Sequence, residues 1–305
     1  MTSRRPAPSH ILAIINRGSG TVQSLGPDIL QQRVRDGLGC EAVLLEGGEI
    51  ASVVSKALRE KRIDTIIVGG GDGTVASVAG QLVGTGVTMG VLPLGTMNMV
   101  AQAIGLPAGL DAAITALAGG GAALIDVGRV NGKVFLHQVS FGMQPRVVRI
   151  RERIGYRSRI TKMISGLLAI LAVLARPRPV RLISIESGVF TRLRIPALAI
   201  SNNIYRSDRP GIPVRLDGGM LGVYAVSAWR WRDYVRIALA TLRGTWKEDD
   251  MVEARATKAI RLMPMRRRGG GKIQASVDGE LEFLDFPIEI ANEPGALRMI
   301  IPASP

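Results

Sequence analysis

Residues 69–74 read Gly-Gly-Gly-Asp-Gly-Thr and follow directly on the apolar run Thr65–Val68. Consecutive glycines let the backbone take positive φ and bring its N–H groups close to a ligand. A strand, a glycine turn and a helix together make a place for phosphate, because the N–H groups and the helix dipole both favour an anion. A carboxylate such as Asp72 suits this loop when Mg²⁺ accompanies the phosphates. The alternative is a tight structural turn, although three glycines with Asp and Thr exceed what a turn needs.

Strand-like and helix-like segments alternate through the first 120 or so residues. Apolar runs predict strands at 10–16, 41–45, 63–68 and 87–92. Helical spacing and stop signals predict helices at 27–38, 50–61, 75–82, 98–104 and 111–118. This alternation favours a parallel sheet covered on both faces, with ligands at the carboxyl ends of its strands. The loops that fall at that end are 16–20, 69–74 and 93–96.

The pattern changes near residue 123. Two apolar runs, 124–130 and 133–140, are joined by Asn131-Gly132, a strong hairpin signal. Further strand candidates follow at 180–186, 192–201, 221–227, 257–263, 272–277, 288–291 and 298–301. Two helices are expected among them, at 159–175 and 232–243. We therefore predict an α/β nucleotide-binding domain with a parallel sheet at 9–126 and a mainly antiparallel β domain at 127–305.

Composition limits the partners and the compartment. The 305 residues carry a net charge of +14, which attracts polyanions such as nucleic acid, anionic lipid or a phosphorylated substrate. An aromatic content of 4% and the lack of a recognition motif argue against nucleic acid. The single cysteine, Cys40, excludes an intramolecular disulfide and fits a reducing compartment. The N-terminus shows no secretory signal, and the most apolar segment, 163–174, is too short to span a bilayer.

Four short motifs occur in order along the chain. They are Asn16-Arg-Gly-Ser-Gly20, Gly70-Gly-Asp-Gly-Thr74, Pro93-Leu-Gly-Thr-Met-Asn98 with Gly105-Leu-Pro107 after it, and Asp278-Gly-Glu280. A weaker match is Ser140-Phe-Gly142. Together they resemble the motifs of the diacylglycerol-kinase-type lipid kinases, which share a fold with sphingosine kinases and, more remotely, with NAD kinases and 6-phosphofructokinases. The resemblance spans about residues 10–301 and rests on the order and spacing of the motifs.

The resemblance implies transfer of the γ-phosphoryl group of ATP to a lipid hydroxyl, with ATP and Mg²⁺ as cofactors. It implies two phosphate-holding loops, formed by Asn16, Arg17, Gly18, Ser19 and Gly20 and by Gly69, Gly70, Gly71, Asp72, Gly73 and Thr74. Thr74 and Thr96 offer hydroxyls to the nucleotide, and Asp72 is expected to organise Mg²⁺ and the transferring phosphate. Glu280 is expected to be the general base on the lipid hydroxyl. The alternative for Glu280 is a surface carboxylate at a strand end, and Asp278 is expected to fix the turn.

This sequence departs from the family pattern at several positions. The family often has Asn-Asp where this chain has Asn98-Met99, so a carboxylate network with Asp72 and Asp126 lacks one member. Asp126 is equally well explained as a carboxylate at a strand edge. Some relatives hold a structural Mg²⁺ near Asp217, which lies one residue out of register and is the one metal ligand predicted here. Arg17 stands in place of the usual proline, where its charge can reach a phosphate.

A basic segment precedes the apolar stretch 163–174. Its cations are Arg146, Arg149, Arg151, Arg153, Arg157, Arg159 and Lys162, and a second basic tip is Arg266–Arg268. A basic segment beside an apolar helix suits an anionic membrane surface, while a core helix with a solvated basic flank explains it equally well. We expect a cytoplasmic protein, peripherally associated with the inner face of the membrane, that binds a lipid substrate. The sequence does not decide between a monomer and a homodimer.

Three functional hypotheses remain from the sequence. The first is a lipid kinase whose acceptor is diacylglycerol, ceramide or another sphingoid lipid, or phosphatidylglycerol. The second is an NAD kinase, which shares the glycine motif, although no Asn-Glu or Asn-Asp pair lies in the stretch after residue 98 where that family reads its nucleoside. The third is a non-catalytic relative that binds nucleotide or membrane, motivated by Met99 and by the register of Asp217.

Overall fold

The computed structural model describes residues 10–60, 63–154, 178–265 and 271–303. Its contacts divide the chain into two compact units, one with residues up to Val127 together with Pro294–Pro305, and one with Gly128–Glu293. The first unit is α/β with parallel strands and the second is mainly antiparallel β, which confirms the predicted fold class. The predicted second domain extended to residue 305, whereas residues 294–305 belong to the first unit because the last strand returns there.

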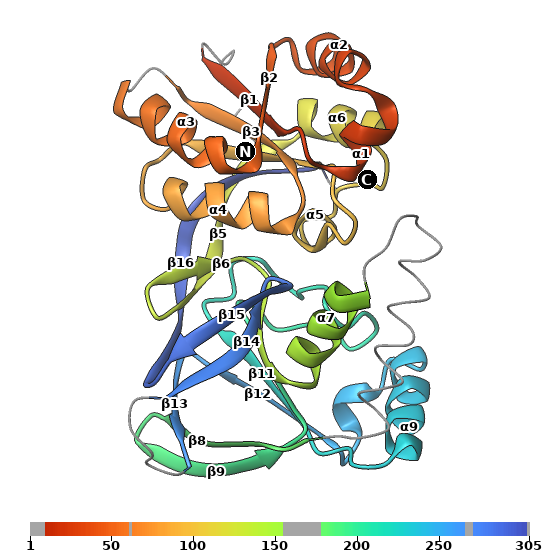
Figure 1. The fold of residues 1–305 in the computed structure, drawn as a ribbon, viewed down its shortest axis with the longest axis vertical. Helices are drawn as coiled ribbons and strands as arrows, with labels where there is room; N and C mark the ends of the chain where they lie inside the picture. Colours follow the sequence, from red (N-terminus) through yellow and green to blue (C-terminus); the bar gives the residue numbers. More distant parts are fainter. Residues whose placement is uncertain (1–9, 61–62, 155–177, 266–270, 304–305) are drawn as a thin grey trace. The chain divides into compact units, whose positions relative to one another are not determined.

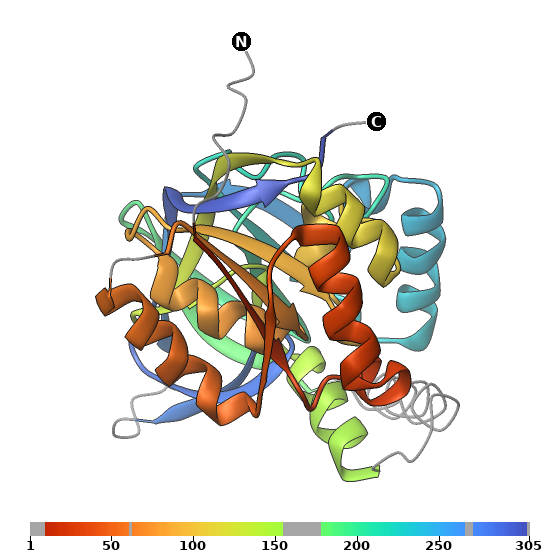
Figure 2. The same cartoon turned by 90° about the horizontal axis from the view of Figure 1, so that it is seen from above.

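Four parallel strands form the sheet of the first unit in the order β2-β1-β3-β4. They are β1 (Ile11–Asn16), β2 (Ala42–Leu45), β3 (Thr65–Gly70) and β4 (Thr88–Pro93). Every residue of β3 is buried, because helices cover both faces of the sheet (Figures 1 and 2). This burial on both faces explains why the strands read as continuous apolar runs in the sequence.

The helices of the first unit connect these strands. They are α1 (Gly20–Leu25), α2 (Pro27–Leu38), α3 (Gly47–Glu60), α4 (Asp72–Leu82), α5 (Met99–Ala103) and α6 (Leu110–Ala118). Figure 2 shows α2 and α6 side by side on one face of the sheet, and α3 and α4 on the other. The short helix α1 was not expected from the sequence, because six residues are too few to show a helical period.

The second unit contains an antiparallel sheet in the order β12-β11-β10-β7-β14-β15. Its strands are β7 (Gln138–Gly142), β10 (Ala197–Ser201), β11 (Leu221–Val226), β12 (Val252–Thr257), β14 (Lys272–Val277) and β15 (Glu280–Asp285). A second group of strands pairs as β16-β13-β8-β9. These are β8 (Val180–Glu186), β9 (Val189–Ile195), β13 (Ala259–Pro264) and β16 (Ile288–Ile301). Side chains of both groups share one core, including Phe141, Leu182 and Leu262.

Two strands carry residues of both units. β5 (Gly121–Val130) forms the predicted hairpin with β6 (Lys133–Phe135), and it also pairs with β16. The sequence predicted two strands where β16 runs unbroken, because Pro294-Gly295 reads as a turn. Gly295 has φ of 60°, and its N–H donates to Asp126 Oδ1 at 2.9 Å, so the buried carboxylate holds the irregular backbone within the strand.

The helical segments of the second unit are α7 (Met143–Ile154), α9 (Trp231–Leu242) and the 3₁₀ turn η1 (Trp246–Glu248). α9 matches the helix predicted at 232–243, and α7 carries Arg146 and Arg149 of the basic segment. The predicted helix at 159–175, its apolar stretch and the tip at Arg266–Arg268 lie outside the described residues. Among the residues that are described, no helix combines the length and the apolar character needed to cross a bilayer.

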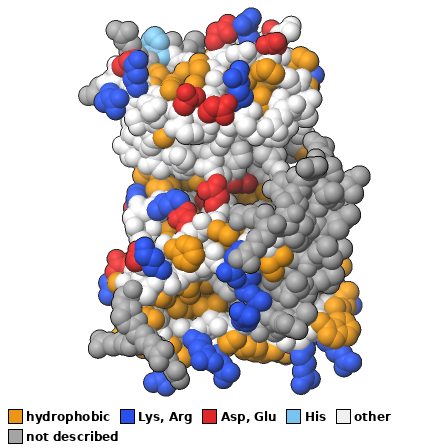
Figure 3. All heavy atoms as spheres, viewed as in Figure 1, with side chains coloured by type: hydrophobic (Ala, Val, Ile, Leu, Met, Phe, Trp, Pro, Cys, Tyr) orange, Lys and Arg blue, Asp and Glu red, His pale blue; other side chains and the backbone are white. Residues whose placement is uncertain are grey.

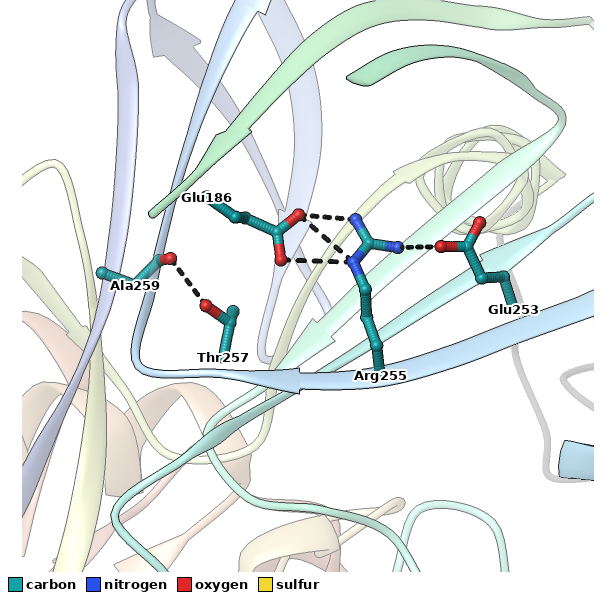
Figure 4. A network of polar contacts seen from close by, with 5 residues as sticks. All are labelled: Glu186, Glu253, Arg255, Thr257 and Ala259. Carbon is teal, nitrogen blue, oxygen red and sulfur yellow. Dashed lines mark hydrogen bonds and ion pairs between the residues drawn. The ribbon is translucent and has the colours of Figure 1, made fainter. Parts of the chain in front are cut away.

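Lys and Arg side chains stand out on the surface of the second unit (Figure 3). One arginine, Arg255, is half-buried and organises the corner between β12 and β13 (Figure 4). Its Nη2 donates to Glu186 Oε1 at 2.6 Å and its Nη1 donates to Glu253 Oε1 at 2.7 Å. Thr257 Oγ1 donates to the carbonyl of Ala259 at 2.9 Å. The sequence predicts a single strand here, at 257–263, which corresponds to β13. It predicts no strand at the position of β12, which ends at this corner.

Candidate active site

The three loops predicted to hold the nucleotide follow β1, β3 and β4 in the first unit. Since these strands are parallel neighbours, their loops meet at one edge of the sheet. Backbone hydrogen bonds join them, because the Leu94 N–H donates to the Gly70 carbonyl at 3.2 Å and the Thr21 N–H donates to the Leu94 carbonyl at 3.3 Å. The structure therefore brings together the predicted residues of 16–20, 69–74 and 93–96.

Asn16 connects the first loop with the glycine loop. Its Oδ1 accepts the Gly18 N–H at 2.9 Å, and its Nδ2 donates to Thr74 Oγ1 at 2.9 Å. Because the Thr74 oxygen accepts this bond, its hydroxyl proton is directed elsewhere and can be donated. One amide side chain thus sets the spacing between the two predicted phosphate loops.

The glycines of residues 69–73 are needed for close packing. Positive φ was the expected reason, but none of these glycines has it, so that expectation is wrong. A Cβ built on Gly69 would lie 2.8 Å from Leu94 and 2.9 Å from Ile15. A Cβ on Gly95 would lie 2.5 Å from the Cα of Gly71. Glycine is required because the glycine loop and the loop after β4 contact each other backbone to backbone.

The start of α4 offers backbone donors at this edge. The helix begins at Asp72, and Gly71, at its N-cap, provides no side-chain cap. Such a helix start favours an anion because its first N–H groups lack intrahelical partners. In the first loop, Ser19 is buried and its Oγ has no hydrogen-bond partner among the described residues. A buried hydroxyl without a partner is costly, so it points to a ligand or ordered water at this loop.

Asp72 and Asn98 connect the glycine loop with the loop after β4. Asp72 Oδ1 accepts the N–H of Val100 at 3.2 Å, near the start of α5. Asn98 adopts the left-handed conformation, with φ of 48°. Its Oδ1 accepts the Gly95 N–H at 2.9 Å and its Nδ2 donates to the Gly95 carbonyl at 3.0 Å. Asn98 belongs to one of the four sequence motifs, but it is not among the site residues predicted from the sequence. Thr96 and Arg17 are exposed nearby in these loops.

The acidic motif of the second unit places its two carboxylates in opposite environments. Asp278 is buried, and its carboxylate accepts three backbone N–H groups, from Leu136 at 2.7 Å, His137 at 2.9 Å and Gln138 at 3.0 Å. Burial raises the pKa of Asp278, while these hydrogen bonds and His137 oppose the shift. Glu280 is exposed at the start of β15, and its carboxylate has no hydrogen bond or ion pair to the described residues.

Aromatic side chains surround the segment that Asp278 holds. The ring of Tyr205 stacks on Tyr224 with a centroid distance of 5.1 Å, and on His137 at 5.5 Å. The Tyr205 hydroxyl donates to Gln138 Oε1 at 3.0 Å. Burial raises the pKa of Tyr205 well above its ordinary value, so the hydroxyl stays protonated. The sequence alone does not indicate these residues, because they are far apart along the chain and form no linear motif.

Comparison with known proteins agrees with this geometry. The family profile "Diacylglycerol kinase catalytic domain" matches residues 10–130, which contain all three loops. Residues 10–130 are thus similar to the diacylglycerol kinase catalytic domain. A YegS-like protein from Citrobacter koseri, named a probable lipid kinase, is 36% identical over 110 residues, which are 34% of this chain and 36% of that protein. The YegS protein of Salmonella newport, named likewise, is 37% identical over 110 residues, again 34% and 36% of the two chains. The match thus spans about a third of these curated relatives.

Solved structures resemble the whole fold. A candidate diacylglycerol kinase from Bacillus anthracis str. Sterne has a TM-score of 0.74 at 19% identity, covering 97% of this chain and 98% of the other. A diacylglycerol kinase structure from the same organism has a TM-score of 0.67 at 18% identity, with the same coverage. At these identities the likeness shows the fold, and it extends to the second unit, beyond the diacylglycerol kinase catalytic domain.

The predicted metal ligand Asp217 lies outside residues 10–130, which match the family profile. Asp217 is exposed, and its carboxylate oxygens accept hydrogen bonds from Arg215 Nε at 3.0 Å and from Arg215 Nη2 at 3.1 Å. These bonds lower the pKa of the Asp217 carboxyl group. No group of three or more His, Cys, Asp or Glu side chains suited to a metal occurs in the part of the chain that is described. A carboxylate paired with arginine and lacking neighbouring ligands does not fit a Mg²⁺ site. The Asp126 carboxylate is also used within the fold, because its Oδ1 accepts the Gly295 N–H at 2.9 Å.

Proposed function

We propose that this protein is an ATP-dependent lipid kinase that transfers the γ-phosphoryl group of ATP to a lipid hydroxyl. The observation that carries the proposal is the set of three interlocked loops at the strand ends of the diacylglycerol kinase catalytic domain. The uncapped start of α4 and the buried Ser19 hydroxyl both favour an anionic ligand there.

Each loop residue has a role in this proposal. Backbone N–H groups of 16–20 and 69–74 bind the phosphates, Thr74 and Thr96 donate hydroxyls to the nucleotide, and the exposed Arg17 pairs with a phosphate. Mg²⁺ enters as part of the substrate, bound to the ATP phosphates. Asp72 sits at the helix start that receives those phosphates, where a carboxylate can orient the ion and its waters.

The phosphoryl transfer needs a base for the acceptor. Glu280 removes the proton from the lipid hydroxyl as its oxygen attacks the γ-phosphorus, and the bond from that phosphorus to the β-phosphate oxygen breaks to release ADP. The carboxylate of Glu280 is exposed and pairs with no side chain in the described part of the chain, which supports this role. Asp278 acts as a positioning residue, because its three backbone hydrogen bonds hold the turn from which Glu280 projects.

The acceptor belongs to the class of membrane lipids with a free hydroxyl. Diacylglycerol, ceramide or another sphingoid lipid, and phosphatidylglycerol are the candidates. Such acceptors reside in bilayers, so we propose peripheral association with an anionic membrane surface. The net charge of +14 supports this partner, since basic proteins are attracted to anionic lipids.

A labelling experiment tests the proposed function. The full chain is incubated with γ-labelled ATP, Mg²⁺ and separate panels of the candidate lipids and NAD. We expect label in one lipid and none in NAD. Label in NAD alone would instead identify an NAD kinase. Binding of ATP without any labelled product would identify a non-catalytic relative.

A further inference from the structure

The helix α9 exposes an apolar face to solvent. Its outer face carries Trp231, Val235, Leu239 and Leu242, which are 62%, 47%, 46% and 85% exposed. These four residues, here named the apolar stripe, follow a spacing of four, four and three, so they lie in one row along the helix. Exposed large apolar residues gathered in one row mark an interaction surface, whereas scattered ones need no explanation.

The opposite face of α9 is anchored to the second unit. Ile237 and Ala240 pack against the cluster of Tyr205, Tyr224, Trp246 and Val252. The Tyr234 hydroxyl donates to the carbonyl of Ala228 at 2.7 Å. The helix is therefore held by its inner face, and the apolar stripe is not the side by which it joins the core.

Cations flank the apolar stripe. Arg232 and Arg243 are exposed and have no ion pair with any described residue, whereas the exposed Arg230 lies near Asp233 and helps to lower the pKa of that carboxyl group. The Arg232 guanidinium lies over the Trp231 ring, 5.7 Å from its centroid. Tryptophan with arginine beside an apolar row is the composition of helices that lie in the interface of an anionic bilayer. A protein partner's apolar groove does not require this surplus of unpaired positive charge.

A second cluster of cations lies on β8 and β9. Arg181 and Arg194 face each other across these strands, and Arg192 lies two residues from Arg194 on the same side. These three residues, the arginine cluster, line a hollow of about 670 Å³ together with Ile183, Pro264 and Met265. None of the three has an ion pair with a described residue. Like charges directly opposite each other repel, so the arginine cluster favours an external anion beside it.

The apolar stripe and the arginine cluster belong to the same end of the second unit. In Figure 1, β8, β9 and α9 all lie at the lower end of this unit, and Figure 3 shows both hydrophobic and basic side chains there. We propose that this end docks on an anionic phospholipid bilayer, with the apolar stripe inserted at the interface and the arginine cluster facing lipid phosphates. This proposal rests on the proposed function, because a kinase of membrane lipids must reach a bilayer.

Vesicle binding by the full chain tests the docking surface without ATP. Sedimentation is measured with phosphatidylglycerol–phosphatidylcholine vesicles and with pure phosphatidylcholine vesicles, at low and at high salt. We expect tight binding to the anionic vesicles at low salt and little binding to neutral ones. Leu239→Gln with Leu242→Gln is expected to weaken binding at least tenfold at both salt concentrations. Arg192→Gln with Arg194→Gln is expected to weaken it by about tenfold or more at low salt, and by much less at high salt, where charges are screened.

Matched controls come from the first unit. Ile29→Gln changes an exposed apolar residue of α2, and Arg298→Gln changes an exposed arginine of β16. Both are expected to leave vesicle affinity within twofold of the wild-type value. Because all the substituted side chains are exposed, circular dichroism spectra of the variants are expected to match the wild type.

Tryptophan fluorescence reports insertion directly. Trp246 is buried, whereas Trp229 and Trp231 are exposed. Anionic vesicles are expected to shift the emission to the blue, brominated lipids to quench it, and Trp231→Phe to remove most of both effects. Unchanged vesicle affinity of the Leu239→Gln and Leu242→Gln double variant would overturn the proposal. So would a fall in molecular mass of that variant, which would assign the apolar stripe to a second copy of the chain.

The outcomes separate this surface from the kinase activity. Phosphorylation of a short-chain, water-soluble acceptor without any vesicle binding would overturn the docking surface and leave the proposed function standing. Vesicle binding that depends on the apolar stripe, without label in any lipid, would support the docking surface and overturn the proposed function.

Discussion

Asp278 and Glu280 lie two residues apart, yet only one of them is available to a substrate. The Asp278 carboxylate accepts hydrogen bonds from three backbone N–H groups. The Glu280 carboxylate is exposed and has no partner among the described residues. The turn between them, Asp278-Gly279, has φ of 47° and 90°, as in the tight turns that favour Asp-Gly. The difference in burial supports the proposed roles, a positioning residue for the first carboxylate and a general base for the second.

Glu280→Gln tests the assignment of the base. Glutamine keeps the size of the side chain but cannot accept the hydroxyl proton. We expect kcat to fall by at least about 10²-fold, since general bases contribute that much or more. Steady-state kinetics on the preferred lipid measures the change. The control is Asp285→Asn, an exposed carboxylate of the same strand, and turnover of the Glu280 variant near that of the control would remove the residue from the mechanism.

Asp72→Asn distinguishes the two roles of Asp72. The asparagine Oδ1 can still accept the Val100 N–H, so a purely structural residue would tolerate the change. If the charge organises Mg²⁺ and the transferring phosphate, we expect kcat to fall by at least about 10²-fold with little loss of thermal stability. Measuring kcat and the melting temperature on the same preparation separates these outcomes, and a variant with normal kcat would restrict Asp72 to capping α5.

At the scale of elements, the glycine loop is defined by what it contacts. Gly69 and Gly70 belong to β3 and are buried, while Gly71 lies against Gly95 of the neighbouring loop. The sequence pattern correctly predicted a strand, a loop and a helix, but the reason for the glycines is interloop packing. Only the pairing of β3 with β4 brings Gly71 and Gly95 together.

Gly95→Ala tests this packing. Its Cβ would lie 2.5 Å from the Gly71 Cα, which is backbone and cannot turn aside. We expect a loss of about 1–3 kcal/mol in the free energy of unfolding, as for overpacked positions, and a marked loss of ATP affinity because the glycine loop must shift. Chemical denaturation and calorimetric titration with ATP measure the two effects. Gly48→Ala is the control, since its Cβ would meet nothing within 4 Å, and equal behaviour of the two variants would contradict the role of interloop contact.

At the scale of the whole molecule, two strands continue from one unit into the other. β5 and β16 pair with each other, and Arg129 of β5 holds Glu293 of β16 with two bonds of 2.6 and 2.8 Å. The hydrogen bond and charge of Arg129 hold the pKa of Glu293 below its ordinary value. This ion pair lies at the point of the chain where the second unit ends.

The contribution of this ion pair depends on pH. A carboxyl group whose pKa is lowered by folding stabilises the protein at a pH above its pKa in the unfolded chain, which is about 4.5 here. This stabilisation is lost as the pH falls through the pKa of the folded protein. We expect Glu293→Gln to lower the free energy of unfolding by about 0.5–1 kcal/mol at pH 7, because the pair is partly exposed. The difference from wild type is expected to shrink as the pH falls below 4.5 and to vanish below the folded pKa of Glu293, as measured by chemical denaturation at each pH. A difference independent of pH would show that packing, and not charge, is responsible.

The sequence by itself determined the fold class and the positions of the loops that are predicted to hold the nucleotide. Strand and helix periods are local properties, so β1, β3, β4 and α9 were predicted close to their observed bounds. The same holds for the motifs at 16–20, 69–74 and 93–98, which need only a strand end and a loop to define them. Their order along the chain was sufficient to indicate the family.

Tertiary structure decided which of those residues are free to act. Asp278 receives the N–H of Leu136 from 142 positions away, and Asp72 caps Val100 from 28 positions away. Such contacts depend on the packing of whole elements, which no local period encodes. The exposure of the apolar stripe on α9 is decided in the same way, because its spacing alone fits a buried helix equally well. Burial and long-range hydrogen bonds therefore distinguish the proposed positioning residues from the exposed residues that are proposed to bind a substrate or a bilayer.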